Sequence, residues 1–401
     1  QMDLIKRGVA EIIPEDDLVR KIERSIKTKK SLNIKLGCDP SRPDLHLGHS
    51  VVLRKLRQFQ DIGHQAILII GDFTGMIGDP SGRSKTRPAL SMDDTRQNGQ
   101  TYFEQATKIL SAQRISMYYN SEWLGKMNFA DVIKLASKYT VARMMERDDF
   151  SQRFKAGEPI SVHELLYPLA QAMDSVAIKA DVELGGTDQK FNLLVGRDIQ
   201  REFGLEPQVT LMMPILPGTD GVEKMSKSLD NYIGISEPAR EIYGKTLRIP
   251  DELIYAYFEL TTDVTTKDLK SIKQELDQKK SNPRDLKRRL ARSLVALYHS
   301  PDDASKSEEE FDRIFVQKAL PDEVEEFEVR DNAGSVDILT LLTRAKLVAS
   351  NGEARRLIEQ GGVTIDGEKV TDHRAMLPEK PEFILKVGKR RFLRIKVQHS
   401  H

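Results

Sequence analysis

The sequence has little of what marks a disulfide-linked or membrane-spanning protein. A single cysteine, Cys38, excludes an internal disulfide framework and any CxxC zinc module. The longest apolar runs, such as residues 66–70, are far shorter than the roughly 20 residues that cross a bilayer. The first residues carry no apolar stretch typical of a signal peptide. We therefore expect a cytoplasmic protein with no membrane partner.

An excess of one charge is also missing. The 62 lysines and arginines nearly cancel the 61 aspartates and glutamates, which leaves a formal net charge of +1. A chain with this balance does not coat nucleic acid along its whole length, so we expect no DNA partner and only local RNA binding. Basic residues outnumber acidic ones after residue 336, which indicates a basic terminal module.

Hydrophobic residues make up 39% of the 401 residues, which is enough for a large core. The length of the chain suggests two or three domains. In the first 213 residues, five apolar, β-rich segments alternate with helix-period stretches. This alternation predicts an α/β fold with a doubly wound, Rossmann-type parallel sheet, whose ligands lie at the carboxyl ends of the strands. The five segments are residues 32–38, 66–70, 115–119, 182–184 and 209–213.

The helix signals are clear at several places. A helix over 47–62 should end at Gly63, and a second over 91–110 should begin with a capping box of Ser91 and Asp94. From residue 236 to about 327 the pattern is helical and strongly charged. We expect a sheet domain over residues 1–232, a helical domain over 233–330, a linker within 323–335, and a small α+β domain over 336–397.

Two histidines follow the first predicted strand. His46 and His49 are three residues apart at a predicted helix start, where their ring N–H groups and the positive helix end suit a polyphosphate. Gly48 leaves the backbone bare between them, so a flat base could lie against it. Two packed or solvated histidines are the plainer interpretation. No third ligand is evident, so a metal site is not expected.

A lysine-containing loop follows the fifth predicted strand. Its residues 223–228 read Glu-Lys-Met-Ser-Lys-Ser, with Lys224 and Lys227 three residues apart beside small hydroxyl residues. Flexible ammonium groups suit a phosphate whose charge moves during a reaction. Alone, the segment is equally typical of a solvated loop.

Three polar residues, Tyr167, Gln171 and Asp174, form one stripe of a helix that the capping box Ser161/Glu164 should begin. Their apolar neighbours indicate partial burial, where polar groups need partners. A solvated face is the alternative. A Gly-Gly-Thr-Asp-Gln turn follows at residues 185–189.

Together the histidine and lysine segments resemble the HIGH and KMSKS elements of class I aminoacyl-tRNA synthetases. The Tyr-x-x-x-Gln-x-x-Asp helix and the turn at 185–189 narrow the resemblance to the bacterial tyrosyl-tRNA synthetases. This resemblance implies that the chain activates L-tyrosine with ATP and transfers it to the 3′ end of tRNA(Tyr). It also implies a homodimer formed through a segment of about residues 121–181, inserted in a catalytic domain of residues 1–232. The helical domain would then bind the anticodon.

The resemblance further implies roles for individual residues. Those for the amino acid are Asp79, Tyr167 and Gln171 on the ammonium, Gln189 on the reacting carboxyl end, and Asp174 on the phenol. For ATP, the expected contacts to the nucleotide are from Asp39, Ser41 and Gly48, and those to the ribose are from Gly186 and Asp188. His46 and His49 would contact the phosphates in the transition state. The residues expected around the departing pyrophosphate are Lys224, Met225, Ser226, Lys227 and Ser228. Magnesium is expected on ATP, without a dedicated all-protein cage.

The sequence departs from the family pattern in three places. Lys35 replaces the tyrosine that elsewhere helps bind the substrate hydroxyl, so we expect Asp174 to lack its usual partner. Cys38 replaces an aromatic residue and is interpreted as core rather than as a reactive thiol. Pro168 would kink the substrate helix.

The run 354–367 resembles a small RNA-binding fold that a ribosomal protein shares with many bacterial tyrosyl enzymes. Adjacent Arg355 and Arg356 on a short helix can straddle phosphates, although a solvated basic face is the alternative.

Rival functions remain. They are tryptophan activation on the same fold and an inactive RNA-binding protein derived from a synthetase. A nicotinamide dehydrogenase is disfavoured because residues 71–82 lack the GxGxxG spacing, and a P-loop ATPase because no Gly-Lys-Ser/Thr follows a glycine-rich loop.

Overall fold

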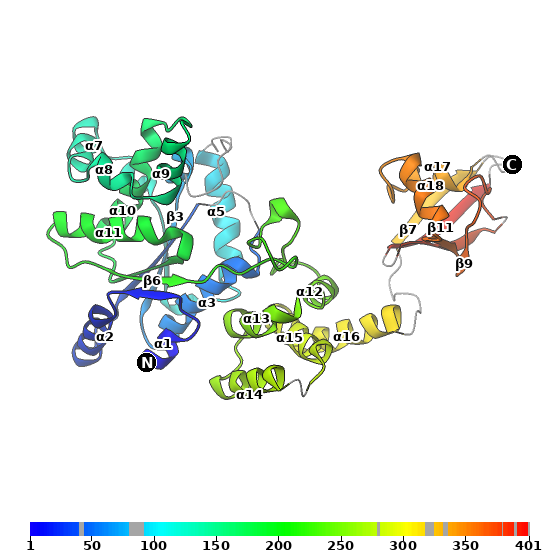
Figure 1. The fold of residues 1–401 in the computed structure, drawn as a ribbon, viewed down its shortest axis with the longest axis horizontal. Coiled ribbons are helices and arrows are strands. Elements are labelled where there is room, and N and C mark those ends of the chain that lie inside the picture. The colour runs from blue at the N-terminus through cyan, green and yellow to red at the C-terminus, as the bar shows by residue number, and fades with distance from the viewer. Residues whose placement is uncertain are drawn as a thin grey trace. The chain divides into compact units, whose positions relative to one another are not determined.

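The computed structural model describes residues 1–39, 44–79, 92–278, 281–316, 325–331, 336–378, 380–388 and 391–399. They form two compact units, Gln1–Ser305 and Lys306–His401 (Figure 1). None of the helices in these ranges is long and apolar enough to cross a membrane.

The first unit is built on a six-stranded sheet with the order β1-β6-β5-β2-β3-β4. The five predicted strands are present and parallel, which confirms the expected α/β fold. A short strand that we did not predict, β1, pairs antiparallel with β6 at one edge. The strands are β1 (Glu11–Ile13), β2 (Asn33–Cys38), β3 (Gln65–Ile70), β4 (Ile115–Tyr119), β5 (Val182–Gly186) and β6 (Val209–Met213).

The helices of this unit follow the alternation that the sequence predicts. The predicted helix over 47–62 is α3, which ends just before Gly63, a glycine with φ of 102° that suits a helix end. The predicted helix over 91–110 is α5, which ends earlier, and Ser91 lies outside the described residues. The helices are α1 (Met2–Lys6), α2 (Glu15–Thr28), α3 (Leu47–Asp61), α4 (Thr74–Ile77), α5 (Met92–Ala106), α6 (Ser121–Leu124), α7 (Phe129–Ala136), α8 (Val141–Met144), α9 (Asp148–Lys155), α10 (Tyr167–Ala177) and α11 (Lys190–Glu202).

The helix that carries the polar stripe begins later than we predicted. The capping box of Ser161 and Glu164 starts a 3-10 turn, Val162–Leu166, and α10 begins only at Tyr167. Pro168 therefore lies in the first turn of α10, where its missing N–H has no intrahelical acceptor to lose. The predicted kink was wrong for this reason.

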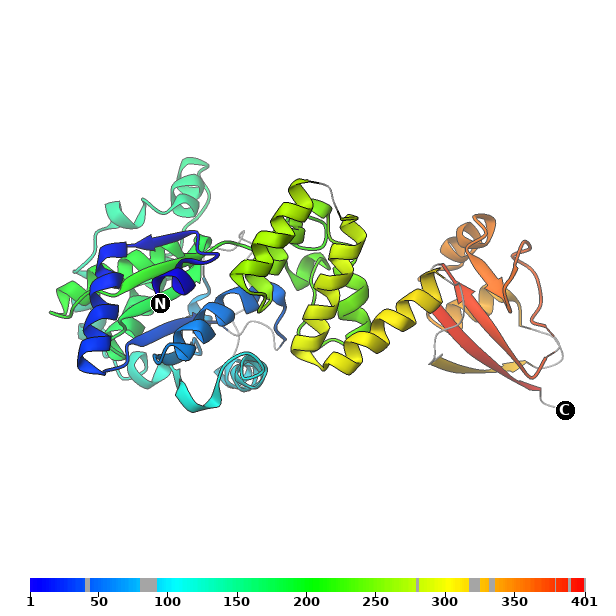
Figure 2. The ribbon, with the colours of Figure 1, turned by 90° about the horizontal axis from the view of Figure 1, so that it is seen from below.

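Of the helices described after the sheet, the first four pack together, and the last spans the boundary between the two units at residue 305 (Figure 2). Leu286, Leu290 and Leu294 of α15 are buried at the predicted helical spacing. Arg54 of α3 pairs with Asp263, which attaches these helices to the sheet layer. The helices are α12 (Ala239–Thr246), α13 (Ile254–Thr261), α14 (Thr266–Asp277), α15 (Pro283–Tyr298) and α16 (Pro301–Phe311).

The second unit is a five-stranded sheet with two helices. Its strand order is β7-β11-β10-β8-β9, and apolar side chains of α17, α18 and the sheet form its core. The elements are β7 (Glu325–Asp331), α17 (Ile338–Arg344), α18 (Asn351–Glu359), β8 (Val363–Ile365), β9 (Glu368–Lys369), β10 (Glu382–Val387) and β11 (Arg391–His399).

The predicted linker was partly wrong, because all of its described residues, 325–331, form strand β7, parallel to β11. Phe327 and Val329 pack against the core of this unit, while Glu326 and Glu328, which alternate with them, are exposed. Glu326, for example, lies 2.6 Å from Lys396. Apolar and acidic residues alternate here with the period of two that is typical of a strand, but the many acidic residues made the segment resemble a linker.

Candidate active site

The histidine segment lies directly after β2 and begins α3. His46 is the N-cap of α3, and its Nδ1 accepts the backbone N–H of Gly48 at 3.1 Å. The Nδ1 of His49 accepts the backbone N–H of His46 at 3.3 Å. Because both Nδ1 atoms act as acceptors, each neutral ring carries its proton on Nε2 and can donate it to a ligand.

Both imidazoles are neutral at physiological pH. Burial, the neighbouring ring of His49 and the charge of Lys227 hold the pKa of His46 well below its usual range. Desolvation and Lys227 lower the pKa of His49 to about 4, although its side chain remains accessible from solvent. The two ring centroids are 3.9 Å apart. Such a close pair of rings is tolerable because neither carries a charge.

The lysine segment forms a loop that Asn231 organises. The side chain of Asn231 accepts the backbone N–H of Ser226 at 2.7 Å and donates to Asp220 at 2.6 Å and to the carbonyl oxygen of Lys224 at 3.2 Å. The ammonium of Lys227 pairs with Asp44 and lies over the ring of Tyr232. The loop backbone is therefore fixed at Asn231.

The histidine and lysine segments are linked by backbone pairing. The N–H of Leu47 donates to the carbonyl oxygen of Ile233 at 2.9 Å, and the N–H of Ile235 donates to that of Leu45 at 3.0 Å. This short ladder lies within a few residues of both motifs, so the positions of the two motifs are coupled.

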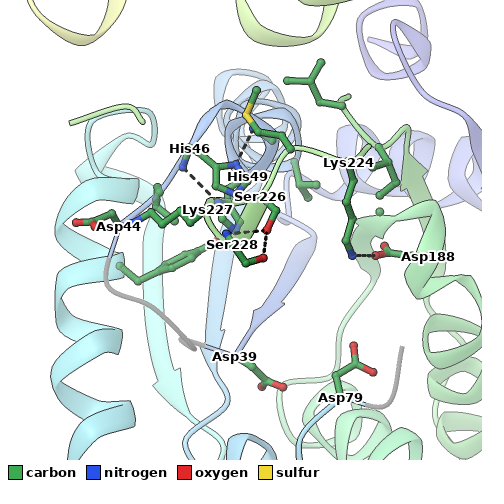
Figure 3. Close-up of a pocket in the computed structure, with 18 of the residues that line it drawn as sticks. Asp39, Asp44, His46, His49, Asp79, Asp188, Lys224, Ser226, Lys227 and Ser228 are labelled. Atoms are coloured by element: carbon green, nitrogen blue, oxygen red, sulfur yellow. Dashed lines mark hydrogen bonds and ion pairs between the residues drawn. The ribbon is translucent and has the colours of Figure 1, made fainter. Parts of the chain in front are cut away.

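Both segments line one cavity of about 580 Å³ at the carboxyl ends of the strands (Figure 3). Its walls include His46 and His49 on one side and Lys224 with Asp188 on the other. Within the described part of the chain, no group of three or more His, Cys, Asp and Glu side chains is arranged to hold a metal ion. The sequence-predicted residues that line the cavity are Asp39, His46, Gly48, His49, Asp79, Gly186, Asp188, Lys224, Met225, Ser226, Lys227 and Ser228. Ser41 lies outside the described residues.

Asp39 joins the cavity to helix α10. Its carboxylate accepts the hydroxyl of Tyr167 at 2.6 Å and that of Thr74 at 2.8 Å. A Cβ on Gly71 would lie 1.9 Å from the Asp39 carboxylate, so only glycine fits beside it. Burial and the nearby Asp39 carboxylate raise the pKa of Tyr167 well above its usual value, so its hydroxyl is a donor.

Asp79 has partners that local sequence patterns did not indicate. Its carboxylate accepts Nε2 of Gln189 at 2.8 Å and lies 3.1 Å from the guanidinium of Arg147, which is 5% exposed. Arg147 also donates to Asn192 at 3.1 Å. Arg147 lies between short helices α8 and α9, in the segment expected to form the dimer, and carries no motif of its own. Sequence reasoning therefore missed it.

Asp188 and Lys224 lie on the same side of the cavity, 3.9 Å apart (Figure 3). Desolvation raises the pKa of Asp188, and the Lys224 ammonium partly offsets that effect. A Cβ on Gly186 would lie 2.6 Å from the Asp188 carboxylate. The glycine thus allows the carboxylate to fold back toward the strand end.

Asp174 lies deeper, outside the cavity lining, and is 3% exposed. Its carboxylate accepts the indole N–H of Trp123 at 2.9 Å, a partner that the sequence did not indicate. Burial raises the pKa of Asp174 to about 7, an effect that the charge of Lys35 opposes. Trp123 is the sole tryptophan and follows β4 at the carboxyl edge of the sheet, which is the signal that could have identified it.

The remaining predicted residues have simple surroundings. Gln171 donates its side-chain amide to Glu183 at 3.2 Å. The thiol of Cys38 donates to the carbonyl oxygen of Ile69 at 3.4 Å, and burial together with Asp39 raises its pKa. In the second unit, Arg355 and Arg356 of α18 are both exposed.

Models of known protein families match most of the chain and agree with the resemblance found in the sequence. Residues 27–316 match the family described as tRNA synthetases class I (W and Y). Residues 316–395 match the tyrosine–tRNA ligase SYY-like C-terminal domain.

Curated relatives extend over nearly the whole chain. The tyrosine–tRNA ligase of Salinibacter ruber is 56% identical over 399 residues, covering 99% of this chain and 96% of that protein. The tyrosine–tRNA ligase of Moorella thermoacetica is 55% identical over 395 residues, covering 98% and 95%. At this identity, the relatives favour tyrosine over the tryptophan alternative.

The fold matches as well. The solved tyrosyl-tRNA synthetase of Archaeoglobus fulgidus, complexed with L-tyrosine, aligns with a TM-score of 0.61 at 24% identity over 76% of this chain and 97% of that one. The chain therefore belongs to the class I tRNA synthetases, and within them to the tyrosine–tRNA ligases, which activate tyrosine with ATP and load it onto tRNA.

Proposed function

We propose that the cavity between the histidine and lysine segments is where ATP and L-tyrosine react, with the roles below for individual residues. The observation that carries the proposal is the backbone ladder between Leu45–Leu47 and Ile233–Ile235, which brings both segments to one cavity. An ATP–pyrophosphate exchange assay with each of the twenty amino acids tests it. Exchange that depends on tyrosine supports the proposal, and exchange that depends on another amino acid, or on none, contradicts it.

The phosphate end of the cavity combines neutral donors with mobile charges. His46 and His49 offer Nε2–H groups at the N-terminus of α3, a helix of 15 residues whose positive end favours an anion. Lys224 and Lys227 approach from the opposite loop, with Met225, Ser226 and Ser228 shaping its turn. When pyrophosphate arrives, Lys224 would leave the carboxylate of Asp188, and Lys227 would leave that of Asp44 and the ring of Tyr232.

The nucleoside would lie between these groups and the strand ends. Gly48 presents bare backbone to the base, since a Cβ there would lie 2.9 Å from the ring of His46. Gly186 and Asp188 would contact the ribose, and Asp39 and Ser41 the nucleotide side of the cleft. Desolvation at Asp188 strengthens any hydrogen bond that it accepts from a ribose hydroxyl.

The amino acid would lie along α10. Asp79 supplies a carboxylate for the ammonium, joined by the oxygens of Tyr167 and of the Gln171 side chain, whose amide nitrogen is directed to Glu183. Gln189, held against Asp79, would contact the reacting carboxyl end. Asp174 would accept the hydrogen of the phenol.

In the first step, a carboxylate oxygen of tyrosine attacks the α-phosphorus of ATP in line. The new P–O bond forms as the bond to the bridging oxygen breaks, and pyrophosphate leaves with the negative charge. In the second step, the terminal hydroxyl of tRNA attacks the tyrosyl carbonyl and AMP leaves. No protein nucleophile is needed, because alignment and positive groups aimed at the developing charge supply the acceleration.

Magnesium enters as part of the ATP substrate. Asp79 is paired with Arg147 at 3.1 Å, and Mg²⁺ is expected to take its ligands from the phosphates and water. Because the substrate tRNA is used in translation, we place the enzyme in the cytoplasm.

We also propose three functional parts: a catalytic part over residues 1–232, a helical anticodon-binding part and a small RNA-binding part. The helical part was expected over 233–330, but its residues 325–330 belong to strand β7 and are grouped with the small RNA-binding part, which was expected over 336–397. The exposed Arg355 and Arg356 would contact phosphates of tRNA(Tyr). Replacing both by alanine should weaken tRNA binding and reduce the slope of log affinity against log salt by roughly 0.7 to 0.9 per lost contact. Unchanged affinity and slope would remove them from the RNA interface.

A homodimer is supported by apolar side chains exposed on the segment of residues 121–181. Phe129 on α7, Phe154 on α9 and Val162 are 79%, 71% and 77% exposed. Exposed large apolar side chains within one segment are typical of a protein interface. Sedimentation should show a dimer that the double variant Phe129→Glu/Phe154→Glu converts to monomer, whereas Ile26→Glu, at an apolar position 60% exposed on α2, leaves it intact. A wild-type monomer at micromolar concentration would contradict the proposal.

A further inference from the structure

Lys35 is a charged residue in the middle of the central strand β2, and its side chain is fully buried. Its ammonium donates to the carbonyl oxygen of Gln171 at 3.0 Å and to the hydroxyl of Ser175 at 2.8 Å, and lies 2.8 Å from the Glu183 carboxylate. Three acceptors account for the three N–H groups of an ammonium. Lys35 is therefore not placed to donate to a bound amino acid.

Glu183, on the neighbouring strand β5, is 1% exposed and is equally well satisfied. Besides Lys35 it accepts the side chains of Gln171 and Ser175, each at 3.2 Å, and that of Gln208. A buried ion pair usually gains little stability over apolar side chains of the same volume, so its presence here calls for another reason. The pair fixes the inner face of α10 to two strands of the sheet.

Asp174 lies on α10, one turn beyond Gln171, and is fixed from the other side. Trp123 of α6 donates its indole N–H to it at 2.9 Å, and the side chain of Asn120 also forms a hydrogen bond to it. Burial raises the pKa of Asp174, the Lys35 charge and these two hydrogen bonds lower it, and the Glu183 charge raises it. These are the charged and hydrogen-bonding groups that α6, β2 and β5 present to Asp174.

We infer that Lys35 is a positioning residue for tyrosine selectivity: without touching the amino acid, it fixes the Gln171–Asp174 face of α10 through Glu183 and supplies the positive charge beside Asp174. The inference rests on the proposed role of Asp174 toward the phenol. In this inference, the buried Lys35–Glu183 pair holds Asp174 in position. A second direct hydrogen bond to the phenol would otherwise be needed for the same selectivity. An ionised, rigidly oriented acceptor discriminates against an analogue without the hydroxyl more strongly than a neutral one.

The test compares Lys35→Met, the double variant Lys35→Met/Glu183→Gln and wild type. We measure kcat and KM for tyrosine and for phenylalanine in ATP–pyrophosphate exchange as a function of pH. In both variants KM for tyrosine should rise about tenfold or more, with kcat and the phenylalanine values nearly unchanged. In Lys35→Met the midpoint of the tyrosine pH profile should move upward by about one unit, because loss of the positive charge favours protonated Asp174. In the double variant the midpoint should move less, because loss of the Glu183 charge acts in the opposite direction.

The double variant keeps the inference testable if Lys35→Met alone does not fold, because it removes both buried charges and leaves neither one unpaired. Lys21→Met is the matched control. Lys21 is 1% exposed on α2 and pairs with Asp181 at 3.3 Å, outside the amino-acid site. It should lose stability without a change in the tyrosine-to-phenylalanine ratio or in the pH midpoint.

A folded double variant that keeps both the wild-type ratio and the wild-type pH midpoint overturns the role of Lys35. A failure of the proposed function would be recognised separately, because wild type would then show no exchange with tyrosine. Unchanged selectivity in Asp174→Asn would overturn the role of Asp174, and the role of Lys35 with it.

Discussion

The two ends of the active site are built in opposite ways. At the phosphate end, Lys224 and Asp188 have side chains that are 55% and 38% exposed and meet at 3.9 Å. At the amino-acid end, Lys35 and Glu183 have side chains that are 0% and 1% exposed and meet at 2.8 Å within a network of further hydrogen bonds. The Lys224–Asp188 pair is thus exposed and long, whereas the Lys35–Glu183 pair is buried and short.

This difference follows from the different functions of the two ends of the site. Charge moves onto pyrophosphate during the reaction, and a flexible ammonium on a loop can follow it. Selection between tyrosine and phenylalanine instead depends on the free-energy cost of leaving a polar group unpaired, which is large only where water cannot replace the missing hydroxyl. Acceleration therefore tolerates exposure, whereas selectivity requires burial.

The largest expected effect is at the closed end. Tyrosyl-tRNA synthetases are themselves the standard example of a site that rejects phenylalanine by about 10⁵. Asp174→Asn keeps the shape of the side chain and removes the charge, so it should reduce the ratio of kcat/KM for tyrosine to that for phenylalanine by about 100-fold or more. Pyrophosphate exchange with both amino acids measures this. An unchanged ratio would mean that selectivity does not arise at the buried carboxylate.

At the open end, Lys224→Ala and Lys227→Ala should each slow adenylate formation by about 100 to 1000-fold, the usual cost of removing one preorganised group that stabilises developing charge. Tyrosine affinity should change little, because neither lysine contacts α10. Stopped-flow adenylate formation and equilibrium tyrosine binding measure the two quantities. Lys190→Ala, at a surface lysine paired with Glu11, is the control. Equal losses of rate and tyrosine affinity would contradict the proposal that the two lysines act on the phosphates and not on tyrosine.

A smaller effect is expected from pH at the closed end. Burial raises the pKa of Asp174 to about 7, so the carboxylate is present above that pH and is lost as the pH falls through it. The value of kcat/KM for tyrosine should therefore fall about tenfold per unit below the midpoint, while that for phenylalanine should not. Parallel profiles for the two amino acids would show that another group titrates.

The smallest effect is expected from the histidines. Burial and Lys227 lower the pKa values of His46 and His49, so both stay neutral across the usual histidine range. In Asp174→Asn, where the carboxylate no longer titrates, the exchange rate should be flat from about pH 6 to 8. An inflection near the usual histidine pKa would mean that a charged imidazole occurs at the phosphate end.

Sequence reasoning succeeded where the signal is local and failed where it is spatial. The five parallel strands and α3 were predictable because apolar runs and a glycine after a helix are recognised along the chain. Strand β7 was missed because acidic residues hide the alternation of Phe327 and Val329. In the site, Arg147, Trp123 and Glu183 were missed because their partners, Asp79, Asp174 and Lys35, lie far away in sequence. Only the topology of the sheet brings these pairs together.

The most direct test of the account is single-turnover adenylate formation with tyrosine and with phenylalanine in wild type, Asp174→Asn and Lys224→Ala. The account predicts that Asp174→Asn changes the ratio of the two rates and that Lys224→Ala lowers both rates while preserving their ratio. If Lys224→Ala erodes the ratio as strongly as Asp174→Asn does, the two ends of the site do not divide selection and acceleration between them.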